Sequence, residues 1–172
     1  MKSIPDAYLK IITPLIQTAR GILEEGRPLV GIAFVGNFES NTAVPVVLDT
    51  GSEANKNNSA KLIKLTAELQ NADYIFLMME AWSLRKDKVH QMEEIYERYG
   101  SIAASPYAVD IVSMSLETRH GVWMAQMPIK PKGISKKKRT IGTPEFQLTE
   151  AQGRFVDLLP MKDGAETAGT LH

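Results

Sequence analysis

The sequence predicts one domain of the α/β or α+β class, built on a mixed sheet of five or six strands. Three observations predict it: an apolar stripe at helical spacing near the N-terminus, several short apolar runs typical of strands, and helical patterns between those runs. The chain has 172 residues, enough for one domain with a sizeable core. We expect residues 1–160 to form this domain, with a basic loop at 130–139, and residues 161–172 to be a disordered tail.

The first element is an N-terminal helical segment, whose apolar stripe runs from Tyr8 to Leu23. Pro14 lies inside that stripe, where a proline removes a backbone donor and clashes with the preceding turn. Thr13 and Pro14 instead fit the N-cap and first position of a new helix. The sequence therefore predicts a short helix, a break near Thr13, and a longer helix that stops at Gly26.

Two strands and a helix follow this segment. The strands are "LVGIAFVGN" (29–37) and "AVPVVLD" (43–49), joined by a polar loop. Pro45 cannot donate to a strand ladder, so it marks either the start of the second strand or an edge strand. Asn58 or Ser59 then fits the N-cap of a helix. The inward face of that helix is expected to carry Leu62, Ile63, Leu65 and Leu69.

The strongest strand pattern of the chain is "DYIFLMMEAW", residues 73–82. It is apolar on both faces, which is typical of a strand in the middle of a sheet. A helical pattern over residues 86–100 and a strand pattern over residues 109–117 follow. Strand, helix and strand in this order indicate a βαβ unit, with parallel strands and a right-handed crossover.

A second antiparallel hairpin is predicted with His120 and Gly121 as its two-residue turn. This turn pairs Leu116 with Ala125, and a slip by one residue would scatter the apolar face. One face of the hairpin then collects Val112, Met114, Leu116, Trp123, Ala125, Met127 and Ile129. The other face carries Val122 and Met124 beside polar residues, and we expect it to be a candidate surface for a homo-oligomer.

Composition excludes several classes of function. With 20 basic and 20 acidic residues the formal net charge is zero, so no global field attracts nucleic acid or an anionic membrane. The absence of cysteine excludes disulfides, thiol nucleophiles and iron–sulfur clusters. Asp6, Lys10 and Pro14 interrupt the apolar residues at the start, unlike a signal peptide, and no window approaches the ~18 apolar residues of a membrane helix. We therefore expect a cytoplasmic protein that binds no membrane.

The segment "VVLDTGS", residues 46–52, is an apolar run that ends in Asp49, Thr50, Gly51 and Ser52. It resembles the active-site turn of the retroviral type of aspartic protease, in which each subunit of a homodimer supplies one copy. The resemblance implies catalysis by Asp49, supported by Thr50, with two carboxylates sharing one proton. The same residues also form a common turn, because aspartate bonds to its local backbone and glycine accepts positive φ. Both interpretations, a protease site and a turn before a helix, remain open at this point.

A second candidate site consists of side chains at the predicted strand ends. Its residues are Glu80, Trp82, Arg85, Glu117 and His120. In the βαβ arrangement Glu80 and Glu117 lie near the carboxyl ends of parallel strands, where ligands bind in open α/β sheets. Trp82 offers a ring for stacking, and Arg85 offers a guanidinium for a carboxylate or phosphate. The structural alternative is an ion pair of Glu80 with Arg85 or Arg119, with Trp82 closing the core.

The basic stretch "KPKGISKKKR", residues 130–139, holds six of the 20 basic residues, which leaves 14 basic against 20 acidic residues elsewhere. Phosphate contacts from this stretch would make nucleic-acid binding strongly salt-dependent. The candidates for such contacts are Lys136, Lys137, Lys138 and Arg139. The stretch contains no aromatic residue, and Pro131, Gly133 and Ser135 are typical of a solvated loop, which is the alternative.

Motifs for metal chemistry are absent from the sequence. The histidines His90, His120 and His172 are not at the spacing of a zinc-binding helix. The order helix, β-hairpin, helix and strand is similar to the JAB/MPN metalloprotease scaffold. The paired histidines and downstream acid of that family have no counterpart here, so the resemblance implies an inactive relative. We expect no metal and no cofactor.

These observations favour a non-enzymatic binding or interaction protein, of the kind found among bacterial or phage accessory proteins. Its expected partner is a small molecule or another protein. The first alternative is a retroviral-type aspartic protease that uses Asp49 in a homodimer. The second is a nucleic-acid-binding protein that uses the basic loop 130–139.

Overall fold

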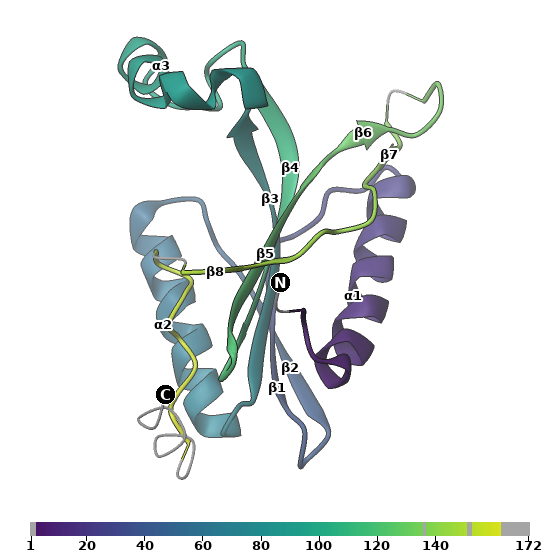
Figure 1. Cartoon of the computed structure of the whole chain (residues 1–172), viewed down its shortest axis with the longest axis vertical. Helices are drawn as coiled ribbons and strands as arrows, with labels where there is room; N and C mark the ends of the chain where they lie inside the picture. The colour runs from purple at the N-terminus through teal and green to yellow at the C-terminus, as the bar shows by residue number, and fades with distance from the viewer. Residues whose placement is uncertain (1–2, 136, 151–152, 163–172) are drawn as a thin grey trace.

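An antiparallel sheet of six strands, with helices against both faces, forms the centre of the structure (Figure 1). The structure is a computed structural model that describes residues 3–135, 137–150 and 153–162; residues 163–172 of the expected tail lie outside this range. The elements are α1 (Asp6–Glu24), β1 (Ile32–Asn37), β2 (Thr42–Val47), α2 (Glu53–Gln70), β3 (Tyr74–Leu84), the 3-10 helix η1 (Lys86–Gln91), α3 (Met92–Tyr99), β4 (Ala108–Thr118), β5 (Gly121–Pro128), β6 (Lys130–Pro131), β7 (Arg139–Thr140) and β8 (Gln147–Thr149). The strand order is β2-β1-β3-β4-β5-β8, and β6 and β7 form a separate ribbon. The predicted α+β domain, with its N-terminal helix and its two hairpins, is confirmed.

One long helix covers each face of the sheet, α1 on one side and α2 on the other (Figure 1). Strand β3 contributes to both layers, because its side chains alternate in direction. Tyr74, Phe76 and Met78 are buried against α1, whereas Ile75 and Leu77 are buried on the α2 side. The prediction that this strand lies in the middle of the sheet is therefore confirmed.

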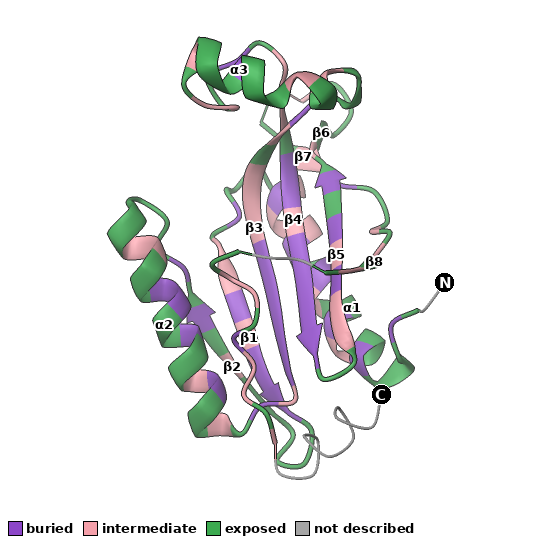
Figure 2. Cartoon of the chain, turned by 60° about the vertical axis from the view of Figure 1, so that its left-hand side comes forward, coloured by how far each residue is buried: buried purple, intermediate pink, exposed green. Residues whose placement is uncertain are grey.

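The predicted βαβ unit is wrong, because β3 and β4 are antiparallel along their whole length. The connection between them, residues 85–107, places η1 and α3 at the far end of the two strands, as a cap beyond the sheet (Figures 1 and 2). A crossover helix needs a broad apolar face to pack on the sheet, and only Ile95 of α3 is buried. Every neighbouring pair in the described sheet is antiparallel. Helix α2 makes the crossover instead, since β2 and β3 are each antiparallel to β1 and so run in the same direction.

Helix α1 runs without a break from Asp6 to Glu24, so the predicted break near Thr13 is wrong. Pro14 lies within the helix on its exposed side. A proline inside a helix costs about 3 kcal/mol, but one continuous buried stripe extends to both sides of it. Burial of several large apolar side chains, at roughly 1.5–3 kcal/mol each, outweighs that cost. The stripe consists of Tyr8, Ile12, Ile16, Ala19 and Leu23.

Helix α2 begins earlier, and turns a different side to the sheet, than the sequence pattern predicts. It starts at Glu53, and the Ser52 hydroxyl caps it by accepting a hydrogen bond from the Asn55 N–H at 3.1 Å. Of the residues expected to face inward, Ile63 is buried, but three are exposed: Leu62, Leu65 and Leu69. Small residues occupy the buried side instead, and they let the helix lie close to the sheet. These are Ser59, Ala60 and Ala67.

The hairpin of β4 and β5 has the predicted faces but a different turn. Arg119 and His120 are the turn residues, and Leu116 pairs with Trp123 instead of Ala125. The pairing differs from the prediction by two residues, and an even shift keeps every side chain on its predicted face. The apolar face is therefore confirmed, since its residues are buried or partly buried against α1.

Gly36 in β1 lies directly opposite Tyr74 in β3, and a Cβ atom at Gly36 would lie 2.0 Å from the Tyr74 Cζ atom. The ring has little room to move, because it packs against Tyr8 and Phe38. We therefore expect Gly36→Ala to lower the free energy of unfolding by about 1–3 kcal/mol in urea denaturation. Gly21→Ala in α1 is the control, because nothing lies within 4 Å of its Cβ position. An equal loss in both variants would contradict the steric explanation.

Candidate functional site

The residues predicted to form a ligand site lie toward two opposite ends of the sheet. Because β3 and β4 are antiparallel, Glu80 pairs with Val112, whereas Glu117 is paired near the start of β3. Trp82 and Arg85 lie with Glu80 toward the cap, and His120 lies with Glu117 near the turn between β4 and β5. The site expected at the carboxyl ends of parallel strands is therefore not assembled. The two groups have to be considered separately.

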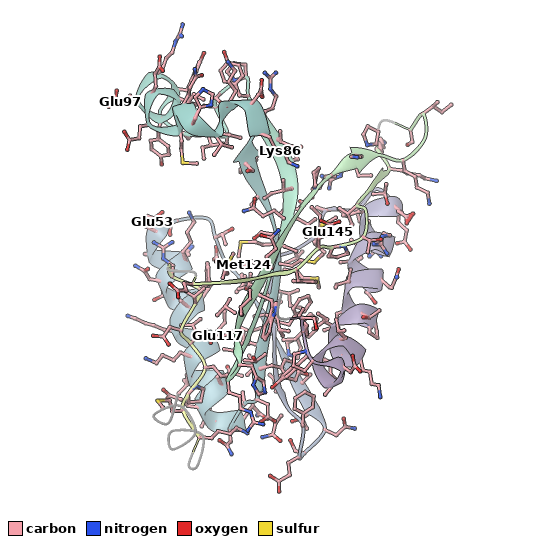
Figure 3. The ribbon with its side chains drawn as sticks, in the orientation of Figure 1. Glu53, Lys86, Glu97, Glu117, Met124 and Glu145 are labelled. Carbon is pink, nitrogen blue, oxygen red and sulfur yellow. The ribbon has the colours of Figure 1, made fainter. Side chains whose placement is uncertain are left out.

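Glu117 is a buried carboxylate that holds the C-terminal part of the described chain (Figure 3). Its Oε1 accepts a hydrogen bond from the Leu158 N–H at 2.9 Å, and its Oε2 accepts one from the Leu159 N–H at 2.7 Å. Burial raises the pKa of this carboxyl above its usual value, and the backbone N–H groups oppose that shift without cancelling it. We call residues 153–162 the C-terminal strap.

The C-terminal strap lies on the α2 side of the sheet and is held at several further points (Figure 1). These are the buried side chain of Leu158, the ion pair of Arg154 with Glu53, and the ion pair of Lys162 with Asp73 at 2.6 Å. The strap therefore supplies both apolar packing and backbone donors to the face of β4 that α2 leaves open. Glu117 has a structural role in this arrangement, and that role accounts for its burial.

Glu80 forms an ion pair with Arg139 of the basic stretch, and not with Arg85 or Arg119. Arg139 Nη2 lies 2.7 Å from Glu80 Oε1. This oxygen is buried and receives no directed hydrogen bond from a described residue, so the charge of the arginine compensates it. Arg85 pairs with Asp87 at 2.9 Å. The ion pair of Glu80 and Arg139 joins β3 to the basic stretch, which were separate candidates in the sequence.

The basic stretch forms an arm on the short ribbon of β6 and β7 (Figure 1). We call residues 130–140 the basic arm. Its base is fixed to α1, because Lys132 Nζ lies 2.8 Å from Glu24 Oε1 and Arg20 Nε donates a hydrogen bond to the Ile141 carbonyl at 3.1 Å. The arm is thus held against both β3 and α1, and its position relative to the sheet is defined by side-chain contacts.

The outer part of the basic arm presents positive charge to solvent. Lys130, Lys137 and Lys138 are exposed, and they form no ion pair with any described residue. Lys136, another predicted nucleic-acid candidate, lies outside the described residues. Of the predicted set, Lys137 and Lys138 are therefore exposed and without an ion pair in the described part of the chain, whereas Arg139 is engaged within the molecule.

Trp82 lies on the same face of β3 as Glu80, because side chains two apart in a strand point the same way. It is 58% exposed, in contrast to Trp123, which is fully buried. The face that carries Glu80 is the one that the basic arm contacts, so the exposed indole lies on the arm side of β3. Asp110 of β4 is directly opposite Trp82 and is also exposed.

The cap adds basic residues at the same end of the molecule. Lys86 lies where β3 meets the cap, and Glu97 lies on the outer part of α3 (Figure 3). Arg85 and Lys88 lie over the ring of Tyr107, at 5.4 and 4.9 Å from its centroid. Figures 1 and 2 both place the cap and the basic arm at one end of the sheet. We call one aromatic and five basic residues exposed at this end the tip surface: Trp82, Arg85, Lys86, Lys130, Lys137 and Lys138. The cap also exposes four acidic residues, so the unpaired positive charge of this end lies mainly on the basic arm: Asp87, Glu93, Glu94 and Glu97.

Asp49 and Thr50 lie in the exposed segment between β2 and α2. Asp49 Oδ1 accepts a hydrogen bond from the Gly51 N–H at 3.0 Å, and its Oδ2 accepts one from the Asn55 side chain at 3.1 Å. These are the contacts of a turn that leads into a helix. An aspartic protease needs a second carboxylate that shares a proton with the first. Neither partner of the Asp49 side chain is an acid.

The element order that the JAB/MPN resemblance rests on, helix, β-hairpin, helix and strand, is present. Within residues 3–135, 137–150 and 153–162, no group of three or more His, Cys, Asp or Glu side chains is placed to hold a metal ion. None of the described helices is long and apolar enough to cross a membrane.

A shallow groove of about 560 Å³ lies beside β5, where the chain before β8 bends away from that strand. Met124 and Glu145 both line it (Figure 3). Gln126, Thr143 and Gln147 also line the groove, and these neutral side chains are exposed. A small-molecule site usually encloses its ligand and directs a few polar groups at it. The open shape and exposed lining of this groove do not meet that description.

No family model, no curated protein and no solved structure matches the chain. The tip surface is therefore interpreted from its own chemistry. Sequence patterns did not join Trp82 to residues 130–139. The available signal was that Glu80 and Trp82 share a strand face, but the sequence does not reveal that Arg139 pairs with Glu80.

Proposed function

We propose that this protein is a non-catalytic binding protein that engages an anionic partner through the tip surface. The observation that carries the proposal is the ion pair of Glu80 with Arg139, which holds the basic arm on the side of β3 where Trp82 is exposed. Lysines attract anionic groups, and an indole offers a flat apolar plane beside them. Such a surface suits a partner that is anionic and has planar or apolar groups.

The carboxylates of the candidate sites support binding rather than catalysis. A general acid or base has to be within hydrogen-bond reach of its substrate. Glu80 is engaged by Arg139, and Glu117 is covered by the C-terminal strap. Asp49 forms the local bonds of a turn. Each of the three carboxylates thus has a partner within the protein that accounts for its position.

The charge that acts on the partner is local. The formal net charge of the whole chain is zero, and the basic arm carries a concentrated share of the positive charge. At physiological ionic strength, charges farther apart than about 8 Å are largely screened. The lysines of the tip surface therefore act on groups in direct contact with them. Binding through such contacts is expected to weaken steeply as the salt concentration rises.

Heparin, a polyanion without aromatic groups, tests the proposed function. We expect the wild-type protein to be retained on heparin at low salt and Lys137→Gln/Lys138→Gln to elute at a clearly lower salt concentration. Each lost contact should reduce the slope of log affinity against log salt by about 0.7–0.9, the value for nucleic-acid phosphates. Arg139 is left intact, because it holds the arm in place.

The matched control is Lys61→Gln/Lys64→Gln, which removes the same charge from exposed positions on α2. We expect this variant to elute with the wild-type protein. If both double variants elute together, retention depends on total charge and the proposed function is wrong. Circular dichroism of each variant checks that the fold is intact.

A further inference from the structure

We infer that the tip surface binds single-stranded nucleic acid, with one base stacked on Trp82 and the phosphates contacted by Lys137 and Lys138. The inference rests on the proposed function and names the chemistry of its anionic partner. It draws on three properties of the surface: an aromatic plane that is open to solvent, cations at the same end of the sheet, and a scaffold that holds both in place.

Trp82 supplies the aromatic plane. An indole that is 58% exposed leaves a large apolar face in contact with water, whereas the other tryptophan of the chain, Trp123, is fully buried. Stacking of a base on such a face is worth about 1–3 kcal/mol and tolerates any base, since every base has a π face. A polyanion such as heparin has no flat group to use this plane. Trp82 therefore distinguishes a nucleic acid from a polyanion that has no aromatic ring.

The basic arm supplies cations on the same side of β3. Lys130, Lys137 and Lys138 form no ion pair within the described part of the chain, so they do not have to break one in order to contact a phosphate. The arm cannot swing away freely, because Arg139 holds it to β3 and Lys132 holds it to α1. The ordering cost of binding is lower when the contacting groups are already held in place.

Asp110 is the acidic group nearest in register to Trp82, directly opposite it in β4. A carboxylate repels phosphate, but it accepts hydrogen bonds from N–H groups of bases, such as the exocyclic amines of adenine and cytosine or the N3–H of thymine. Its position next to the indole thus suits the base end of a nucleotide, while the lysines suit the phosphate end. The carboxylates of an acidic protein segment would meet Asp110 only as a repulsive charge, because an ionised carboxylate cannot donate a hydrogen bond to it.

A single strand fits this surface better than a duplex. In a duplex both faces of each base are stacked on neighbouring base pairs. Trp82 could stack on a base only after that base was unstacked, which costs a few kcal/mol. The major groove of a duplex is wide enough for a two-stranded ribbon such as the basic arm. The indole on β3 would still find no unstacked base there. The open strand offers phosphates and free base faces together.

Tryptophan fluorescence tests the inference on the intact protein. Oligothymidylate of about 16 nucleotides, a length at the upper end of a single binding site, is expected to quench the emission of Trp82. In Trp82→Phe the remaining emission comes from buried Trp123 and should not respond. Affinity, measured by anisotropy of a labelled oligonucleotide, should fall about five- to 150-fold in Trp82→Ala. It should fall less in Trp82→Phe, because a phenyl ring still stacks.

Heparin separates this inference from the proposed function. Trp82→Ala should elute from heparin with the wild-type protein, whereas Lys137→Gln/Lys138→Gln should weaken the binding of both heparin and the oligonucleotide. If Trp82→Ala binds the oligonucleotide as well as the wild type does, or if a duplex of the same length binds more tightly, the inference is overturned and the proposed function stands. If the lysine variant binds both polymers normally, both are overturned.

Discussion

Glu117→Ala is expected to lower the free energy of unfolding by about 2–3 kcal/mol and to detach the C-terminal strap. The substitution removes the acceptor of the Leu158 and Leu159 N–H groups, and each unsatisfied buried donor costs roughly 1–3 kcal/mol. Detachment lets those donors reach water, which limits the loss. Urea denaturation measures the free energy of unfolding. Hydrogen exchange of the Leu158 amide shows whether the C-terminal strap is still attached to Glu117. A stable variant in which this amide exchanges as slowly as in the wild type would contradict the anchoring role.

Glu117→Gln is the reference variant for measuring how Glu117 makes the stability depend on pH, because an amide does not titrate. Burial raises the pKa of Glu117 in the folded protein, so between the usual value of 4.5 and the raised value the folded protein holds more protons than the unfolded chain. The stability contributed by protonated Glu117 is therefore fully present below pH 4.5 and is lost as the pH rises through the folded pKa. The stability of the wild type relative to Glu117→Gln should fall over that window and then level off. A relative stability that rises with pH would mean that the N–H groups outweigh burial.

Arg139→Ala is expected to cost about 1–3 kcal/mol and to loosen the basic arm. The substitution leaves the buried Oε1 of Glu80 without a compensating charge. Loss of one partner of a fully buried pair costs about 3–5 kcal/mol. The cost expected here is smaller than that, because the two side chains are 31% and 30% exposed. Thermal or urea denaturation measures the loss. Oligonucleotide affinity should fall as well, since Arg139 no longer holds the arm against β3.

A double-mutant cycle with Glu80→Gln distinguishes the ion pair from other effects of Arg139. In the Arg139→Ala background, Glu80→Gln removes the uncompensated charge and should recover part of the lost stability. In the wild-type background the same substitution should be destabilising, because it removes a charge from an existing pair. If Glu80→Gln has the same effect in both backgrounds, the two residues are not coupled and the arm is held by its contacts with α1 alone.

Patterns that depend on one strand or one hairpin were predictable from the sequence. The apolar residues on both faces of β3 placed that strand in the middle of the sheet. The faces of the hairpin of β4 and β5 were also correct, although Leu116 pairs with Trp123 and not with Ala125. Alternation along a strand assigns a face, but a shift of two residues preserves every face. The exact turn therefore could not be derived from the apolar pattern.

Features that depend on how helices and strands pack against one another could not be predicted from the sequence. The leucines of α2 and its small residues both recur at helical spacing, and the larger ones point to solvent because the small ones let the helix approach the sheet. Strand, helix and strand in sequence indicated a crossover, but α3 is too polar to cover the sheet and lies in a cap. The same antiparallel return separates Glu80 from Glu117. The ion pair of Glu80 with Arg139 depends on the path of the chain after β5, which no local pattern specifies.

Trp82 and the basic arm are expected to bind one ligand together. The most direct measurement is a titration of tryptophan emission with oligothymidylate, made for the wild type and for Lys137→Gln/Lys138→Gln. We expect the same final quenching of Trp82 in both proteins. The variant should reach it at a higher oligonucleotide concentration, and the difference between the two proteins should shrink as salt is added. Emission that does not change in the wild type, or identical titration curves for the two proteins, would contradict this expectation.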